Sequence, residues 1–191
     1  MKAALTICFL AFLAAPAERV VEGNSRSVVR VIAYEDLQCS DCAVYRKMMD
    51  ERLLPKYGAT VAFEHRDFPL AKHKWAKAAS IACRYLDSVK PETGVAFRQW
   101  VMANQTSITP SNFEAQLLEW AKSNAVDPAL LRAALSDAKI AKLVNDDYEE
   151  GVARGVARTP TVFVNGEPFI ETFTVDEISK SIDTALAASK K

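Results

Sequence analysis

Two cysteines, Cys39 and Cys42, lie two residues apart in the segment YEDLQCSDCAVYRKM, with Ser40 and Asp41 between them. A pair at this spacing has three common uses in proteins. It supplies half of a metal site, it forms a structural disulfide, or it exchanges electrons with another disulfide. Each use needs different surroundings, so the rest of the sequence has to decide among them.

The first two uses are poorly supported. A closed zinc site needs four ligands, and the spacing from the cysteine pair to His65, and from His65 to His73, fits no common zinc-finger pattern. A structural disulfide across two residues closes a very short loop, so it removes little entropy from the unfolded chain. The sequence therefore predicts neither a metal site nor a purely structural disulfide.

The redox use has a physical mechanism. We expect Cys39 at or just before the first residue of a helix, where backbone N–H groups and the positive end of the helix dipole stabilise a thiolate. Cys42 would lie one turn further on and be shielded. The first sulfur can then attack a disulfide, and the second can resolve the mixed disulfide that results.

The elements around the pair fit this mechanism. Val28–Tyr34 is rich in β-branched residues and predicts a buried strand. The helix that starts at Cys39 is expected to end at Pro55 and Gly58. Alternating residues over Ala59–Phe68 predict a second strand. Strand, helix and strand at this spacing indicate a parallel βαβ unit.

A long helical region follows. It is rich in Ala and Leu, and Gly and Pro are sparse within it. The expected helices and their start signals are Lys72–Val89, a helix from near Pro91, a helix after a capping box of Ser111 and Glu114, a helix at Asp127-Pro128, and Asp137–Ala153. The middle of the chain is therefore predicted to be a helical subdomain.

The chain then returns to strands. TPTVFV (Thr159–Val164) and EPFIETF (Glu167–Phe173) predict two strands, and Asn165-Gly166 between them is a strong signal for a tight hairpin. Thr174 is expected to cap a closing helix. An antiparallel hairpin and a helix thus complete the predicted fold.

The start of the chain resembles an export signal. Lys2 precedes an apolar stretch, Ala3–Ala14, and Ala15-Pro16-Ala17 places small residues at a cleavage site. We expect a signal peptide over residues 1–17, or alternatively an uncleaved membrane anchor. Polar residues 18–27 would be a lead-in segment.

Export changes the meaning of the remaining cysteines, because disulfides persist outside the cytoplasm. Cys8 lies inside the apolar stretch and would be lost on cleavage, which leaves Cys39, Cys42 and Cys83. Three is an odd number, so one thiol has no partner within the monomer. Cys83 is expected to be a small buried apolar residue rather than a regulatory thiol.

Three segments resemble the DsbA-like family of thioredoxin-fold thiol–disulfide oxidoreductases. They are YEDLQCSDC around the cysteine pair, RDFPLAKH (Arg66–His73) and GVARTPTVFVNGEPF (Gly155–Phe169). The resemblance implies an α/β thioredoxin fold with an inserted all-helical subdomain. The expected division is a first half at residues 18–70, the insertion at residues 71–155 and a second half at residues 156–191.

The resemblance also implies roles for individual residues. Cys39 would be the nucleophile and Cys42 the resolving thiol. Thr159 and Pro160 would form a loop that faces the sulfurs, with a cis peptide bond before Pro160. The backbone of Thr159 could then pair with an extended substrate, as in strand addition.

Four residues were expected to tune the site, and they include departures from the family pattern. Ser40 and Asp41 replace the Pro and the aromatic or His often found between the cysteines, and an ionised Asp41 opposes a thiolate. Arg158 stands where many relatives have Gly, either as a solvated charge or as a charge that offsets Asp41. Glu35 is a candidate proton relay, displaced by two residues from the position of the family's buried acid. We therefore expect a weaker oxidant than the strongly oxidising relatives.

The predicted function is a periplasmic or secreted thiol–disulfide oxidoreductase without a tightly bound organic cofactor. Its partners would be unfolded or disulfide-containing exported proteins and a membrane redox partner. Lys plus Arg and Asp plus Glu both count 24, so no basic surface for nucleic acid is indicated. Two alternatives remain at the level of sequence: a disulfide isomerase or reductase, and a non-catalytic binding or chaperone module.

Overall fold

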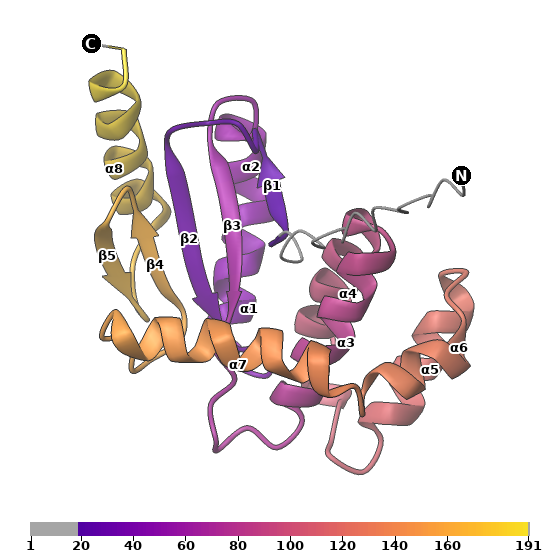
Figure 1. Cartoon of the computed structure of the whole chain (residues 1–191). Helices are drawn as coiled ribbons and strands as arrows, with labels where there is room; N and C mark the ends of the chain where they lie inside the picture. Colours follow the sequence, from indigo (N-terminus) through magenta and orange to yellow (C-terminus); the bar gives the residue numbers. More distant parts are fainter. Residues whose placement is uncertain (1–18, 191) are drawn as a thin grey trace, which may run out of the picture.

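The computed structural model describes residues 19–190, so the predicted signal peptide lies outside the described residues. A five-stranded sheet has the order β1-β3-β2-β4-β5. The sheet carries helices on its faces, and a group of helices extends from one side of it (Figure 1). None of the helices in the described part of the chain is long and apolar enough to cross a membrane.

The centre of the sheet confirms the predicted βαβ unit. β2 (Arg30–Glu35) pairs in parallel with β3 (Ala62–Asp67) and antiparallel with β4 (Thr161–Val164). β5 (Glu167–Ile170) follows β4 at one edge. The hairpin between them turns at Asn165 and Gly166, both with positive φ, as the Asn-Gly signal predicts.

The interpretation of residues 18–27 as a plain lead-in segment was wrong. β1 (Val21–Gly23) pairs antiparallel with β3 and forms the second edge of the sheet. It is short and only half-buried, and the pair Val20 and Val21 at its start lies between polar residues. Three residues with one β-branched side chain are too few to predict a strand from sequence, so β1 is recognised only by its pairing with β3.

The helix after the cysteine pair ends at Gly58, as predicted, but it is not a regular α-helix throughout. α1 (Ser40–Met48) runs through a π-helical turn at Met49–Leu53 into α2 (Leu54–Tyr57). Pro55 does not end the helix: it lies in α2, which follows the π-helical turn directly, and the chain stays helical to Tyr57. The wider π turn gives the chain room to restart there.

The two faces of the sheet have separate cores. On one face, Tyr45 and Met49 of the first helix and Ile178 of α8 (Val175–Ala188) pack against Val31 and Phe63. Thr174 and Glu177 form a capping box at the start of α8, which confirms the predicted cap.

On the other face of the sheet, α7 (Ala138–Ala153) crosses in front of the strands (Figure 1). Its Gly151 allows this close approach, since a Cβ there would come within 2.7 Å of the Phe68 ring and 2.9 Å of the Tyr34 ring. The ring of Tyr148 also stacks on Phe68, with 4.5 Å between centroids. This helix therefore ties the insertion to the sheet.

Five α-helices and a short 3-10 helix lie between β3 and β4 in the chain. The four that precede α7 are α3 (Ala76–Val89), α4 (Pro91–Ala103), α5 (Phe113–Ser123) and α6 (Pro128–Ala134). The cap predicted at Asp127 is present, and Asp137 caps α7 in the same way; each side chain accepts two backbone N–H groups. The capping box at Ser111 was wrong, because α5 begins two residues later and Glu114 pairs with Arg132 instead.

Candidate active site

Cys39 lies at the N-cap of α1, as the sequence predicts. Its backbone is extended, with φ −78° and ψ 126°, and the helix begins at the next residue. The side chain is largely buried, and its thiol donates to the carbonyl oxygen of Thr159 at 3.3 Å. One sulfur is thus placed at a helix start and against a loop 120 residues further along the chain.

The two sulfurs have opposite acid strengths. A hydrogen bond from Cys42 and backbone N–H groups of Cys42 and Asp41 outweigh burial and lower the pKa of Cys39 to about 6. Burial, and then the contact with Cys39, raise the pKa of Cys42 well above its usual range. At neutral pH, Cys39 is therefore the more readily ionised of the two thiols, and Cys42 keeps its proton.

The loop that faces Cys39 contains the predicted cis bond, between Thr159 and Pro160. Both ends of this loop are fastened to neighbouring backbone. Thr161 Oγ1 donates to the Arg158 carbonyl at 2.7 Å, and the Glu171 N–H donates to the Pro160 carbonyl at 2.9 Å. Thr159 is buried, and these two hydrogen bonds hold its carbonyl in position against the Cys39 sulfur.

The expected tuning residues lie at different depths. Ser40 and Asp41 are exposed at the start of α1. Arg158 is also exposed, and its guanidinium pairs with Glu171 at 2.6 Å. The contact of Arg158 is thus with Glu171, which fits a solvated surface charge. A role for these three residues in tuning Cys39 stays a prediction.

Glu35 is fully buried and belongs to a chain of charged groups. Its carboxylate lies 2.6 Å from His65 Nδ1, and His65 Nε2 lies 2.8 Å from Glu22 Oε1. Arg98 approaches the same Glu35 oxygen at 3.6 Å. Despite burial, His65 and Arg98 lower the pKa of Glu35, and the resulting charge helps to raise the pKa of Cys42.

Asp36 is a buried residue of the site for which the sequence predicted no specific contact. Its N–H donates to Cys42 Sγ at 3.3 Å. Its carboxylate accepts the Leu70 N–H and contacts His73 Nδ1, both at 2.7 Å. Asp36 therefore connects the Cys42 sulfur to the segment that enters the insertion. A carboxylate immediately after a buried strand was the available signal, but Leu70 and His73 are more than thirty residues away.

The third cysteine is a buried thiol with a raised pKa, unlike Cys39. Cys83 is fully buried, as predicted, and burial raises its pKa beyond the usual range of a thiol. It belongs to the same apolar cluster as Cys39 and Cys42. Within residues 19–190, no three His, Cys, Asp or Glu side chains gather in a way that could hold a metal ion.

Known proteins share this architecture. The bacterial structure of BdbD from Bacillus subtilis, in its oxidised form, matches with a TM-score of 0.79 and 21% identity, over 88% of this chain and 93% of that one. The structure of α-DsbA1 from Wolbachia pipientis matches with a TM-score of 0.76 and 17% identity, over 90% and 92%. At these identities, the two likenesses establish the fold.

A curated relative is similar in sequence. It is a Rickettsia bellii protein named "Putative protein-disulfide oxidoreductase", 28% identical over 176 residues, which are 90% of this chain and 66% of the relative. The chain thus spans just under two thirds of that relative's length. A family model described as Thioredoxin matches residues 16–184, which include the cysteine pair, the insertion and the cis-proline hairpin. This chain therefore belongs to the thioredoxin family, and its fold is that of the DsbA proteins.

Proposed function

We propose that this protein is a thiol–disulfide oxidoreductase that acts on exported proteins outside the cytoplasm. The observation that carries the proposal is the placement of Cys39, at a helix start and in contact with the carbonyl before cis-Pro160, with Cys42 buried one turn behind it. The name of the Rickettsia relative supports the same activity.

The exchange balances without a cofactor. In one direction, the Cys39 thiolate attacks a substrate disulfide, one substrate sulfur leaves as a thiolate, and a mixed disulfide forms. Cys42 then loses its proton and attacks Cys39 Sγ, which releases the second substrate thiolate and leaves a Cys39–Cys42 disulfide. The substrate gains two electrons and the protein loses them. The reverse sequence oxidises a substrate dithiol.

The loop at Thr159 and Pro160 supplies a place for the substrate chain in this proposal. An extended segment beside the reacting sulfur can form backbone hydrogen bonds with Thr159, and such bonds accept many sequences. Signal-peptide cleavage after Ala17 would deliver the protein to an oxidising compartment. Intact mass of the exported protein tests that step and is expected to show a chain that starts at Glu18.

Variants of the three cysteines test the activity. Cys39→Ala is expected to abolish exchange with a disulfide-containing peptide, while Cys83→Ala retains it. Cys42→Ala is expected to accumulate a mixed disulfide, detected by intact mass. Full exchange by Cys39→Ala would overturn the proposal. Peptide binding that survives in Cys39→Ala, together with a wild-type protein that never exchanges disulfides, would instead establish a binding module.

The direction of the reaction follows from an equilibrium with glutathione. A thiolate pKa of about 6 at Cys39 lies above the value of about 3.5 known for DsbA, and a less stable thiolate makes a weaker oxidant. We therefore propose a protein that oxidises less strongly than DsbA. Such an equilibrium distinguishes an oxidase from a reductase without knowledge of the natural substrate.

A further inference from the structure

A side chain from the helical insertion reaches the turn that carries Cys39. Gln105 lies in a short 3-10 helix (Gln105–Ser107) just after α4. Its Nε2 donates to the carbonyl oxygens of Leu37 and Cys39, both at 2.9 Å. One amide group from 66 residues away in the chain therefore uses both of its N–H bonds on the active-site turn.

The two carbonyl oxygens differ in the other hydrogen-bond donors that they have. The Cys39 carbonyl also accepts the Ala43 N–H at 3.2 Å, the first hydrogen bond of α1. Leu37 is fully buried, and among the contacts of the described residues its carbonyl receives its hydrogen bond from Gln105. A buried carbonyl without a donor costs about 1–3 kcal/mol. The turn therefore depends on Gln105 to hold this conformation.

The same turn is held at two further points. Gln38 Oε1 accepts the Trp75 N–H at 3.0 Å, and the Asp36 carboxylate accepts the Leu70 N–H at 2.7 Å. These contacts connect the turn with the entry to the insertion, whereas Gln105 is the one that ends at the carbonyl of the nucleophile itself. Of these three side chains, Gln105 is therefore the one that contacts the backbone of Cys39 directly.

The direction of the effect follows from electrostatics. A carbonyl oxygen carries partial negative charge, and the Cys39 carbonyl belongs to the residue whose sulfur becomes a thiolate. An N–H donor brings a partially positive hydrogen close to that oxygen. The hydrogen bond thereby offsets the repulsion between the carbonyl oxygen and the thiolate. It also fixes the turn so that the backbone N–H groups at the start of α1 stay directed toward the sulfur.

We propose that Gln105 is a positioning residue for disulfide exchange, which holds the Leu37 and Cys39 carbonyls and thereby favours the thiolate of Cys39. This inference rests on the proposed function. It makes the helical insertion a part of the redox centre, since the donor comes from the insertion and the acceptors from the active-site turn.

The test replaces Gln105 by Met, which keeps the length of the side chain but has no donor. The matched control is Gln116→Met, because Gln116 Nε2 donates one equivalent bond to the Ser107 carbonyl at 2.9 Å, within the insertion and away from the turn. Thiolate absorbance is titrated for each protein, with the Cys83→Ala background to leave two thiols. Far-UV circular dichroism checks that each variant is folded.

Gln105→Met is expected to lower the thiolate-to-thiol ratio of Cys39 at a fixed pH by about three- to tenfold, as expected for the loss of one or two hydrogen bonds. The equilibrium constant for oxidation of glutathione by the protein should fall by a similar factor. Gln105→Glu, whose ionised carboxylate can only accept, should shift both further in the same direction. Gln116→Met should leave both unchanged.

Two outcomes would overturn the inference. One is an unchanged titration and glutathione equilibrium in folded Gln105→Met. The other is an equal shift in Gln116→Met, which would indicate general loosening of the insertion. Neither measurement uses a protein substrate. An inactive wild-type protein would therefore contradict the proposed function while the comparison of thiolate titrations still decides the role of Gln105.

Discussion

The helical insertion has an apolar interior and a charged boundary with the sheet. Its interior is a single cluster in which Phe97, Leu117 and Trp120 are buried, and this cluster also contains Cys39 and Cys42. At its boundary, Arg84 and Arg98 from the insertion meet the carboxylates of Glu35 and Asp67 at the carboxyl ends of the central strands. One subdomain thus uses two kinds of packing within a short distance.

The two regions respond differently to change. Apolar side chains stabilise by the surface they bury, and they tolerate partners of similar volume. A buried charge has lost the hydration that stabilises it in water. The attraction of an oppositely charged partner offsets this desolvation cost, so removing the partner is strongly destabilising. The interior therefore makes the insertion stable, while the boundary sets which surface of the insertion meets the sheet behind the sulfurs.

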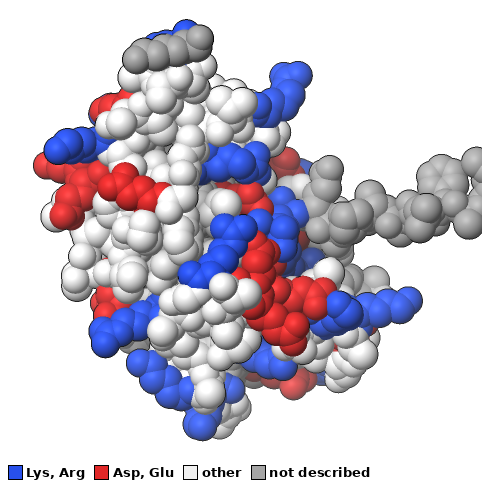
Figure 2. All heavy atoms as spheres, turned by 60° about the vertical axis from the view of Figure 1, so that its left-hand side comes forward, with Lys and Arg blue, Asp and Glu red and all other residues white. Residues whose placement is uncertain are grey.

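Mixed charge continues onto the surface. Lys and Arg alternate with Asp and Glu across the face in Figure 2, with no field of one sign on that face. Exposed ion pairs also occur, as between Lys142 and Asp146. They provide a reference for the buried pairs, since the same charges in water contribute little.

The largest expected effect comes from Arg84→Met. Arg84 is 6% exposed and pairs with both Asp67 and Asp147, so its loss removes the nearest cation from two buried carboxylates. We expect the free energy of unfolding in urea to fall by about 4 kcal/mol. Lys142→Met, which breaks an exposed pair, should cost less than about 0.5 kcal/mol. Equal losses in the two variants would remove the distinction between boundary and surface.

The apolar interior was largely predictable from sequence, and the charged boundary was not. Helical spacing of Trp75, Ala79 and Leu86 indicates a buried stripe, and all three are buried. The Cys-x-x-Cys pair, the Thr-Pro segment and the Asn-Gly turn are likewise local signals, and each predicted feature occurs. These signals depend on neighbours in the chain, which a sequence displays directly.

The partners at the boundary are distant in the chain. Glu35 and His65 are 30 residues apart, and Arg84 and Asp147 are 63 apart. On its own helix, Arg84 has the same pattern as a solvated charge, so nothing local indicates that it is buried. Gln105 was missed for the same reason, since its amide acts on a turn that precedes it by more than sixty residues.

The second prediction concerns the interior. Leu117 is fully buried in the apolar cluster, and Leu117→Ala should lower the free energy of unfolding by about 3 kcal/mol through lost transfer energy and a residual cavity. No titratable group is removed, so the loss should be the same at pH 5 and pH 8. Urea unfolding at both values measures it. A loss that varies by more than about 1 kcal/mol would mean that the interior is coupled to the charged boundary.

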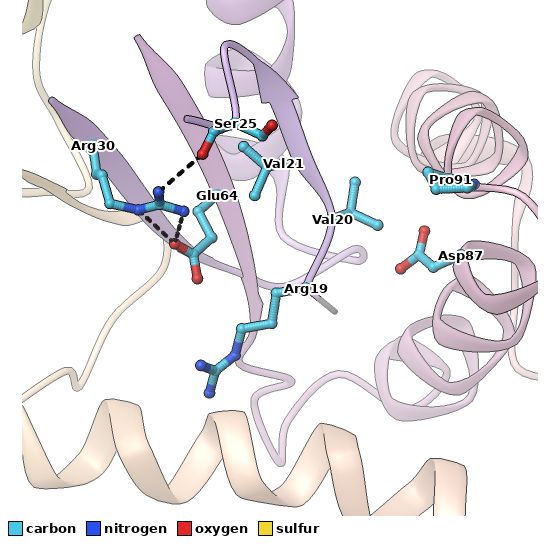
Figure 3. A pocket seen from close by; sticks show the side chains of 8 residues that line it. All are labelled: Arg19, Val20, Val21, Ser25, Arg30, Glu64, Asp87 and Pro91. Carbon is cyan, nitrogen blue, oxygen red and sulfur yellow. Dashed lines mark hydrogen bonds and ion pairs between the residues drawn. The ribbon is translucent and has the colours of Figure 1, made fainter. Parts of the chain in front are cut away.

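The smallest effect, and the one of opposite sign, comes from Asp87 in α3. It lines a cavity of about 470 Å³, and Figure 3 shows it on the far side of Val20 from the Arg30–Glu64 pair. Its Oδ1 is buried and has no hydrogen-bond partner among residues 19–190. Burial raises the pKa of Asp87 to about 6, against the attraction of Arg98. Asp87 is therefore a member of the boundary whose charge is incompletely compensated.

The sign follows from proton linkage. A carboxyl that is more basic in the folded state than its ordinary value of 3.8 binds a proton more tightly when folded, so stability falls as pH rises from about 4 to about 6. Asp87→Asn stays neutral and escapes this loss. It should match the wild type near pH 4 and be more stable by about 2 kcal/mol above pH 7. Asp183→Asn, at an exposed pair with Lys56, should show no such pH dependence. A difference between Asp87→Asn and wild type that is constant from pH 4 to pH 8 would show that Asp87 is compensated after all. Each buried charge of the boundary would then be compensated by a partner. Boundary and interior would still differ in the type of side chain that they pack, but not in how their stability depends on pH.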